Sequence, residues 1–353
     1  MARRGSSQDG PAGLIVVDKP QGFTSHDVVG KMRRIAGTRR VGHAGTLDPM
    51  ATGVLILGIN QATKLLTWVT GEGKSYEATI RLGQSTVTDD AEGDVTNTAD
   101  AATVGELSRS SVEAAVGDLT GEIRQVPSAV SAIKVNGVRS YARVRSGEDV
   151  HLEARPVTIR AFDIHDCRSA TTDEGASVLD VDVSVTCSSG TYIRALARDL
   201  GTALGVGGHL TRLRRTAIGE VGIDDASTLE QLEAARDSGQ DLPVLPLTEA
   251  AARLFRRREL TAEEATALSN GRWIEPTDDL LETGGSSGPN DIVPAEQLAA
   301  AYAPDGTLVA LCHNQVRRGR SVAVPHLVFA SGQRFETCLL YTSPSPRDRT
   351  RSR

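Results

Sequence analysis

The sequence is poor in aromatic residues and has no long hydrophobic run. Phe, Trp and Tyr make up 3% of the 353 residues, whereas hydrophobic residues as a whole make up 39%. A hydrophobic core must therefore be built from aliphatic side chains. No apolar run approaches the length of a transmembrane helix, and the first residues lack the apolar segment of a signal peptide. We therefore expect a cytoplasmic protein with no membrane partner.

Cysteine is also scarce, and neither cysteine nor histidine shows metal-ligand spacing. The four cysteines include no Cys-x-x-Cys pair, and the seven histidines include no His-x-x-x-His pair. This excludes the common zinc signatures and predicts free thiols in a reducing compartment. A glycine-rich loop of the kind that cradles phosphates is missing as well. The sequence therefore predicts neither a metal site nor a cofactor.

Positive charge is not in excess over the whole chain, so a nucleic-acid site has to be local. The formal net charge is −6. Residues 1–70 nevertheless contain nine Lys and Arg against four Asp and Glu, while residues 86–118 contain one Arg and eight acidic residues. We expect the first region to attract phosphate groups and the second to repel them. The acidic residues 83–101 are interpreted most simply as a solvent-exposed loop.

The most informative stretch is centred on Asp48. Arg39 and Arg40 stand at its start, His43 lies among glycines, and an apolar run follows. Pro49 disfavours the helical conformation for Asp48, and glycines let the backbone approach a ligand closely. This pattern predicts a rigid, irregular loop that leads into a buried strand, with the two arginines placed for phosphate contacts. The alternative is that Asp-Pro marks only a turn and that the arginines are simply solvated.

This stretch resembles the catalytic motif of the TruB family of bacterial tRNA pseudouridine synthases. The residues that carry the resemblance are Gly42-His43-Ala44-Gly45-Thr46-Leu47-Asp48-Pro49-x-Ala51-x-Gly53-Val54-Leu55. The resemblance implies the pseudouridine synthase α+β fold, with a mixed, mostly antiparallel sheet. It also implies a monomer that isomerises uridine 55 in the T arm of tRNA to pseudouridine, with neither cofactor nor guide RNA.

Three further motifs follow in the family's order. They are Asp18-Lys19-Pro20-x-Gly22-x-Thr24-Ser25, Lys74-x-Tyr76 and Gly190-Thr191-Tyr192-Ile193-Arg194-x-Leu196-x-x-Asp199-Leu200-Gly201. By resemblance, Lys19 belongs to the RNA-binding residues, Tyr76 packs against the target base, and Arg194 pairs with Asp48. Ser25 stands where the N-cap of a helix is expected. Taken alone, Tyr76 is typical of a core residue in an alternating strand, and Arg194 of a helix surface.

Two other segments match the family. A glycine-rich turn leads to Leu213, which the resemblance makes an apolar wall of the base pocket, and to Arg214 and Arg215, which it makes phosphate contacts. The family's tRNA-gripping insertion is expected at about residues 124–150. Within it, Lys134 is either a phosphate contact or a solvent-facing lysine.

The resemblance and the composition together predict the domain organisation. We expect a disordered segment at residues 1–11, a catalytic domain at residues 12–246, and a small β-rich domain at residues 247–337. The last of these is similar to the PUA RNA-binding fold, although a generic small β domain describes it nearly as well. Residues 338–353 resemble translated sequencing adapter more than protein. We therefore expect a non-native tail there rather than a basic RNA-binding tail.

The reaction explains why these residue types are expected. Pseudouridine formation breaks the N1–C1′ bond of uridine and rejoins the uracil through C5, so nothing is oxidised. A covalent route needs a nucleophile that stays ionised in a dry pocket, and a nearby arginine favours an ionised carboxylate. This predicts Asp48 as nucleophile, while attack at C6, attack at C1′ and glycal formation all stay open. His43 either replaces the flipped base in its stack or makes a structural hydrogen bond, and Tyr76 is a candidate base for the C5 proton.

Two rival functions fit parts of the same pattern. One is a protein that mainly remodels tRNA, which would have no need of a buried carboxylate beside RNA. The other is a relative that depends on a guide RNA. The bacterial-style insertion and the lack of long lysine-rich tails favour an enzyme that acts alone.

Overall fold

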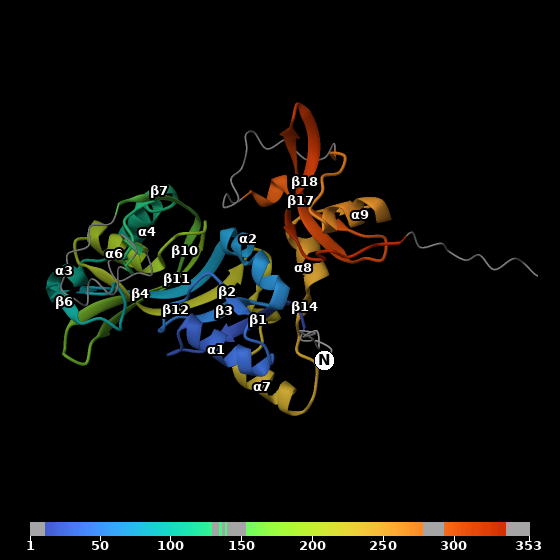
Figure 1. The fold of residues 1–353 in the computed structure, drawn as a ribbon. Coiled ribbons are helices and arrows are strands. Elements are labelled where there is room, and N and C mark those ends of the chain that lie inside the picture. The colour runs from blue at the N-terminus through green and yellow to red at the C-terminus, as the bar shows by residue number, and fades with distance from the viewer. Residues whose placement is uncertain (1–10, 129–133, 136–137, 140–152, 278–292, 337–353) are drawn as a thin grey trace, which may run out of the picture. The chain divides into compact units, whose positions relative to one another are not determined.

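The computed structural model describes residues 11–128, 134–135, 138–139, 153–277 and 293–336. The chain divides into two compact units, Met1–Val244 and Leu245–Arg353 (Figure 1). Most of the predicted insertion, the tail at 338–353 and nearly all of the predicted disordered N-terminus lie outside the described residues.

The first unit is built around one extended sheet with helices packed against it (Figure 1). Its strands are β1 (Gly13–Lys19), β2 (Val41–Ala44), β3 (Thr52–Ile59), β4 (Lys74–Leu82), β5 (Gln84–Thr86), β6 (Val95–Thr98), β7 (Gly121–Gln125), β8 (Lys134–Val135), β9 (Val138–Arg139), β10 (Arg155–Thr171), β11 (Ser177–Cys187), β12 (Gly208–Ile218) and β13 (Val221–Gly222). Its helices are α1 (Ser25–Ile35), α2 (Leu66–Gly71), α3 (Ala101–Gly105), α4 (Arg109–Asp118), α6 (Ile193–Ala203) and α7 (Leu229–Asp237), with 3₁₀ turns at Asn60–Leu65 and Ile223–Asp225.

The sheet runs in the order β1-β3-β12-β4-β11-β10-β7, with β2 paired to β3 and β13 paired to β12. These pairs are antiparallel except for β12 and β3, which run parallel. The predicted mixed, mostly antiparallel sheet is therefore confirmed. The strand β12 joins two halves of the sheet, and its Arg214 and Arg215 pair with Thr52 and Gly53, where β3 begins just after the Asp48 loop.

Aliphatic side chains make the core, as the scarcity of aromatic residues requires. The strands β4 and β11 alternate buried and less buried residues, so that one face packs on α6. The helix α6 contributes Ile193, Leu196, Ala197 and Leu200 to this face. This packing fixes the first turn of α6 against the sheet, and the first turn carries Arg194.

The acidic segment at residues 83–101 is not simply a solvent-exposed loop. It contains β5 and β6, and Asp90 within it is buried and forms a bridge with Leu210 of β12. The backbone N–H of Leu210 also donates to the carbonyl oxygen of Asp89. The segment folds back onto the sheet because these main-chain bonds tie it there, which composition alone does not reveal.

Gly53 is required where β3 and β12 run side by side. Its φ is +99°, and a Cβ atom there would lie 2.1 Å from the carbonyl oxygen of Arg215. Strained φ and overpacking each cost about 1–3 kcal/mol. We therefore expect Gly53→Ala to lower the free energy of unfolding by about 3 kcal/mol, measured by urea denaturation. Gly30→Ala is the matched control, because Gly30 lies in α1 with open space around it, and this change should be neutral or stabilising.

The second unit is small and rich in strands, as predicted. Its elements are β14 (Leu245–Pro246), α8 (Leu247–Leu254), β15 (Arg256–Glu259), α9 (Ala262–Ser269), a 3₁₀ turn (Ala295–Gln297), β16 (Ala299–Tyr302), β17 (Leu308–Arg317) and β18 (Arg320–Val328). A sheet in the order β15-β16-β17-β18 packs on α9 around an alanine-rich core.

Candidate active site

Asp48 lies on the loop between β2 and β3, and the start of α1 holds this loop in place. The Oγ atom of Ser25 accepts a hydrogen bond from the N–H of Leu47 at 2.9 Å and donates to its carbonyl oxygen at 3.2 Å. Thr24, not Ser25, is the N-cap of α1, so the sequence-based N-cap was wrong by one residue. The shift leaves the Ser25 hydroxyl available to hold the residue next to Asp48.

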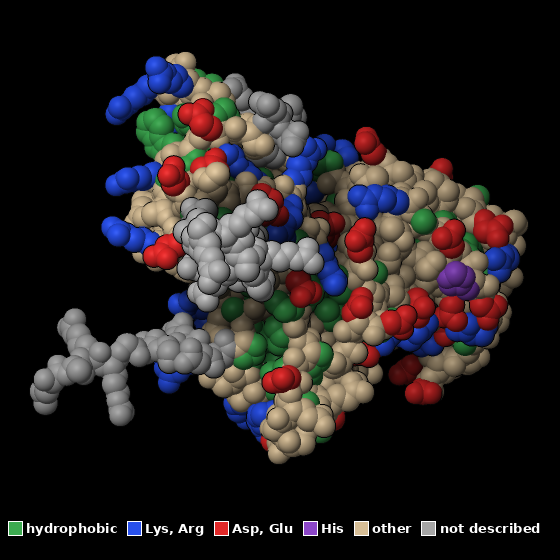
Figure 2. Space-filling model, turned by 90° about the vertical axis from the view of Figure 1, so that its right-hand side faces the viewer, with side chains coloured by type: hydrophobic (Ala, Val, Ile, Leu, Met, Phe, Trp, Pro, Cys, Tyr) green, Lys and Arg blue, Asp and Glu red, His purple; other side chains and the backbone are tan. Residues whose placement is uncertain are grey.

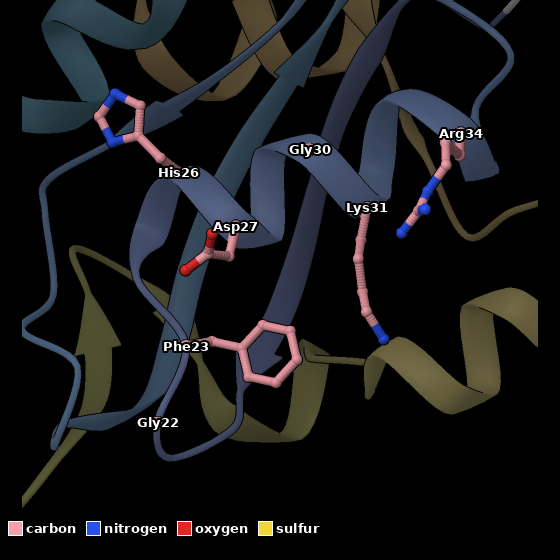
Figure 3. Close-up of a pocket in the computed structure, with 7 residues that line it drawn as sticks. All are labelled: Gly22, Phe23, His26, Asp27, Gly30, Lys31 and Arg34. Carbon is pink, nitrogen blue, oxygen red and sulfur yellow. The ribbon is translucent and has the colours of Figure 1, made fainter.

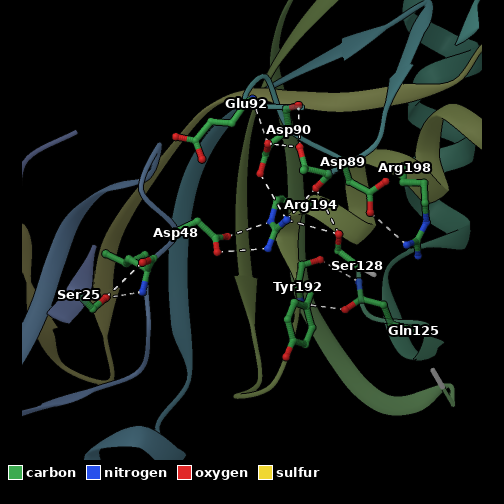
Figure 4. Close-up of polar contacts among 12 residues, drawn as sticks. Ser25, Asp48, Asp89, Asp90, Glu92, Gln125, Ser128, Tyr192, Arg194 and Arg198 are labelled. Atoms are coloured by element: carbon green, nitrogen blue, oxygen red, sulfur yellow. Dashed lines mark hydrogen bonds and ion pairs between the residues drawn. The ribbon is translucent and has the colours of Figure 1, made fainter. Parts of the chain in front are cut away.

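Arg194 faces Asp48 through two nitrogens (Figure 4). Its Nε atom lies 2.9 Å from Oδ2 of Asp48, and its Nη2 atom lies 3.2 Å from Oδ1. The Arg194 side chain is 5% exposed, whereas the Asp48 side chain is 36% exposed. The predicted pair is thus present, with the arginine buried behind a carboxylate that reaches solvent. Such a two-pronged contact fixes the direction of the carboxylate as well as its distance.

A second carboxylate, that of Asp90, also contacts Arg194, and the sequence analysis did not identify it. Oδ2 of Asp90 lies 3.4 Å from Nη1 of Arg194, and the Asp90 side chain is 4% exposed. The other oxygen of Asp90 accepts from the Thr88 hydroxyl at 2.5 Å and from the N–H of Glu92 at 3.1 Å. Arg194 is therefore held from behind while it faces Asp48. No local signal in the sequence marks Asp90, because its burial depends on the bridge to Leu210.

The backbone at the start of α6 is held by Gln125 at the end of β7. The Gln125 side chain accepts from the N–H of Tyr192 at 2.8 Å and donates to its carbonyl oxygen at 3.1 Å. Tyr192 is the N-cap of α6 and has no side-chain cap of its own. Gln125 thus fixes the residue two positions before Arg194 (Figure 4).

Tyr76 and Leu213 line the same hydrophobic cluster as the residues that flank Asp48. Tyr76 lies on β4 and Leu213 on β12, and both are buried with Leu47 and Met50. Burial raises the pKa of Tyr76, and the nearby Arg215 guanidinium opposes this rise. The structure therefore brings together Asp48, Arg194, Tyr76 and the apolar wall.

Lys19 and Arg215 are corrected from RNA contacts to structural residues. Lys19 is 0% exposed, and its Nζ donates to the carbonyl oxygens of Phe23, Pro20 and Pro49. Arg215 is 1% exposed. Its guanidinium donates to the carbonyl oxygens of Val54 at 2.7 Å and Gly45 at 3.0 Å. Both cations are enclosed by the backbone around the Asp48 loop, so neither reaches a phosphate at the surface.

The other predicted basic contacts differ in accessibility. Arg39 and Arg40 are exposed just before β2, so a contact with phosphate stays a prediction. Arg214 is partly exposed and forms a two-pronged ion pair with Asp18, at 3.0 and 2.8 Å. A phosphate would have to compete with that pair. The side chain of Lys134 lies outside the described residues.

His43 lies on β2 with its Nδ1 atom buried and without a hydrogen-bond partner among the described residues. Burial lowers its pKa, and the neighbouring His26 and Arg215 lower it further. The ring therefore stays neutral near pH 7. His26 packs edge to face against it, with the ring centroids 5.5 Å apart. His26 also lines a cavity of about 560 Å³ along α1 (Figure 3).

The described residues contain neither a group of side chains suited to a metal ion nor a helix long and apolar enough to cross a membrane.

Comparison with solved structures places this fold among known ones. An H/ACA ribonucleoprotein bound to a substrate RNA containing 2′-deoxyuridine has a chain that is 23% identical to this one. The TM-score is 0.61, and the match covers 92% of this chain and 87% of that chain. An archaeal box H/ACA Nop10–Cbf5 complex matches with the same TM-score and identity, covering 94% and 90%. At this identity the likeness concerns the fold alone.

Sequence comparison gives the class and then the family. Residues 33–193 match the TruB family pseudouridylate synthase N-terminal domain, and this match points to the class of pseudouridine synthases. Residues 194–250 match the tRNA pseudouridylate synthase B C-terminal domain, and residues 255–326 match the C-terminal domain of tRNA pseudouridine synthase II.

The relatives agree with these matches. The tRNA pseudouridine synthase B of Arthrobacter sp. (strain FB24) is 59% identical over 90% of this chain and 97% of its own length. That of Streptomyces coelicolor is 52% identical over 89% and 97%. The chain belongs to the TruB family, and the resemblance stated from the sequence is confirmed.

Proposed function

We propose that this protein isomerises uridine 55 in the T arm of tRNA to pseudouridine, with Asp48 as the nucleophile. The observation that carries the proposal is the pairing of a partly exposed carboxylate with a buried arginine on a pinned loop. The relatives' names support tRNA as the substrate. The position within tRNA follows from the resemblance of the Asp48 motif.

The site suits a base that has been flipped out of the RNA. Asp48 provides the accessible carboxylate, while Arg194 keeps it oriented through two contacts. Tyr76 and Leu213 form the apolar wall on which the uracil would rest. Extraction of a base from its stack costs a few kcal/mol, and these contacts repay part of that cost.

His43 is the residue we assign to the vacated position in the RNA. The residue is only partly buried on β2, at the start of the Asp48 loop, so part of its ring is open to RNA. A neutral ring also suits stacking between bases. Arg39 and Arg40, which are exposed just before β2, are the residues that we propose to contact RNA phosphates.

A stand-alone enzyme is favoured over a guide-dependent one. The solved H/ACA structure shares the fold at 23% identity, whereas two relatives named tRNA pseudouridine synthase B are 59% and 52% identical over about nine-tenths of this chain. We also propose that the second unit is a PUA-like RNA-binding domain, as its small β-rich sheet suggests.

The direct test is single-base mapping of pseudouridine in an unmodified tRNA transcript after incubation with the full chain. We expect one modified position, the T-loop uridine, without added cofactor or guide RNA. A transcript in which that uridine is replaced by cytidine is the control for position. Binding without any modification would replace this proposal with tRNA remodelling, and modification only with a guide RNA would replace it with a guide-dependent activity.

Tyr76→Phe tests the role of the phenol as a base. Loss of a general base costs about 10²–10⁴-fold in rate, so we expect the single-turnover rate constant to fall in that range while tRNA affinity changes little. Because burial raises the pKa of Tyr76, the ionised fraction is small at neutral pH and grows as pH rises. The wild-type rate should therefore rise with pH, and the variant should lose this rise. An unchanged pH profile would show that Tyr76 only packs against the base.

A further inference from the structure

The second unit exposes a tryptophan on its surface. Trp273 is 42% exposed, in a chain that has two tryptophans. The next residue, Ile274, is buried and forms a bridge with Ala323 of β18, so the backbone at Trp273 is fixed. Exposing an indole ring to water at a fixed place on the surface is unfavourable, and the packing of the fold gives no reason for it. It is the kind of side chain that anchors a binding partner.

Two arginines from the β17–β18 hairpin lie over this indole. The guanidinium carbons of Arg317 and Arg318 are 5.8 and 5.9 Å from the centre of the Trp273 ring. These distances are at the outer limit of a cation–π contact, so each guanidinium can turn toward another partner at little cost. Among the described residues, neither arginine is paired with a carboxylate.

The turn of this hairpin favours a different residue from the one present. Arg317 pairs with Arg320, so Arg318 and Gly319 form a two-residue turn with φ of +51° and +78°. Such turns favour Asn-Gly, because an ordinary side chain is strained at positive φ. Arginine at this position therefore has a backbone cost, and its side chain is directed to the tryptophan. Strain of this kind is typical of functional positions.

The β17–β18 hairpin concentrates positive charge, although the second unit as a whole has no excess of positive charge. Residues 245–336 contain more Asp and Glu than Lys and Arg, yet Arg317, Arg318 and Arg320 are all exposed at one turn. Figure 2 shows Lys and Arg side chains projecting beside hydrophobic surface in the upper part of the view. A cluster of cations around an exposed aromatic ring matches the way proteins hold single-stranded nucleic acid.

We propose that Trp273, Arg317 and Arg318 form a binding site for an unpaired nucleotide stretch of RNA. A base stacks on the Trp273 ring, and the two guanidiniums contact the flanking phosphates. Unpaired rather than double-stranded RNA is required, because bases inside a duplex present no free face to an indole. The inference rests on the proposed function in one respect, namely that RNA is the substrate of this protein.

The test uses Trp273 as its own reporter. In the full chain with Trp68→Phe, Trp273 is the single tryptophan, so its fluorescence reports on this site alone. We expect a short single-stranded oligoribonucleotide to quench the fluorescence and a fully paired duplex of equal length to do so much less. Stacking on an aromatic ring contributes about 1–3 kcal/mol per base, so Trp273→Ala should weaken binding of the same oligonucleotide about tenfold.

Arg318→Asn is the variant that cannot be explained by misfolding. Asparagine is less strained than arginine at a φ of +51°, so the substitution should not lower the stability of the hairpin. We expect its dissociation constant for the oligonucleotide to rise several-fold, and the dependence of log affinity on log salt to fall by about one. Arg253→Asn, outside the hairpin, is the control and should change neither.

The outcomes separate this inference from the proposed function. Quenching by single strands with no pseudouridine formed would support the site and overturn the proposed function. Modified tRNA with no quenching would overturn the site and leave the function standing. Equal quenching by duplex, or quenching only by anionic phospholipid vesicles, would also overturn it, since neither involves a stacked base.

Discussion

Asp48→Asn is expected to abolish pseudouridine formation. The substitution keeps the size of the side chain but removes its charge and the oxygen that we propose as the nucleophile. Removing the nucleophile of other covalent enzymes costs about 10⁴–10⁶-fold, and we expect a loss of at least about 10⁴-fold in the single-turnover rate constant. The measurement is the mapped pseudouridine yield at the T-loop uridine over time.

The control for this variant is Asp163→Asn. Asp163 is an exposed carboxylate on β10, away from the site, and its replacement should leave the rate unchanged. Affinity of Asp48→Asn for tRNA should stay within a few-fold of wild type, because Asp48 is expected to act on the base after binding. An Asp48→Asn protein with normal activity would remove Asp48 from the mechanism.

Arg194→Lys is expected to have the second largest effect. One ammonium group cannot make two contacts with Asp48 and also reach Asp90 and the carbonyl oxygen of Thr88. Disruption of a buried ion pair costs about 3–5 kcal/mol. We expect the single-turnover rate constant to fall about 10²–10³-fold, and the melting temperature to fall as well, because Asp90 is left buried without its partner.

The neighbouring Arg198→Lys is the matched control. Arg198 lies one turn further along α6 and pairs with Asp89 and Asp199, so it carries similar interactions without facing Asp48. Its replacement should lower stability modestly and leave the rate within a few-fold of wild type. Equal rate losses in the two variants would mean that Arg194 matters only for folding. Asp90→Asn adds a second check, since it removes the charge behind Arg194 and should lower the rate while leaving both Asp48 and Arg194 in place.

Residues that belong to a compact motif, such as Asp48 and Arg194, could be predicted from the sequence. Asp90, which contacts Arg194 only because of the fold, could not. Asp48 and Arg194 are far apart in sequence, but each lies in a motif with a distinctive order of residues. Asp90 lies in a segment whose acidity and threonines are equally typical of solvent-exposed loops. Its burial depends on a bridge to Leu210, about 120 residues away, which no local pattern reveals.

The same limit explains the errors on basic residues. Lys19 and Arg215 are the kind of residues that contact phosphate, and a sequence near a catalytic loop invites that interpretation. In the structure their partners are backbone carbonyl oxygens of the loop itself. Carbonyl groups occur at every residue, so only the three-dimensional course of the loop shows that it needs buried cations.

The order of strands has a consequence for the synthesis of the protein. β3 and β4 follow each other in the chain, but β12 lies between them in the sheet. A nascent chain that has not yet reached residue 218 therefore has two strands that lack their shared neighbour, and their open edges can pair wrongly. Both arginines that surround the Asp48 loop, Arg194 and Arg215, also come from this late part of the chain. The proposed catalytic centre is thus completed only near the end of the first unit's translation, and a prematurely terminated chain would have the Asp48 motif without Arg194 and Arg215.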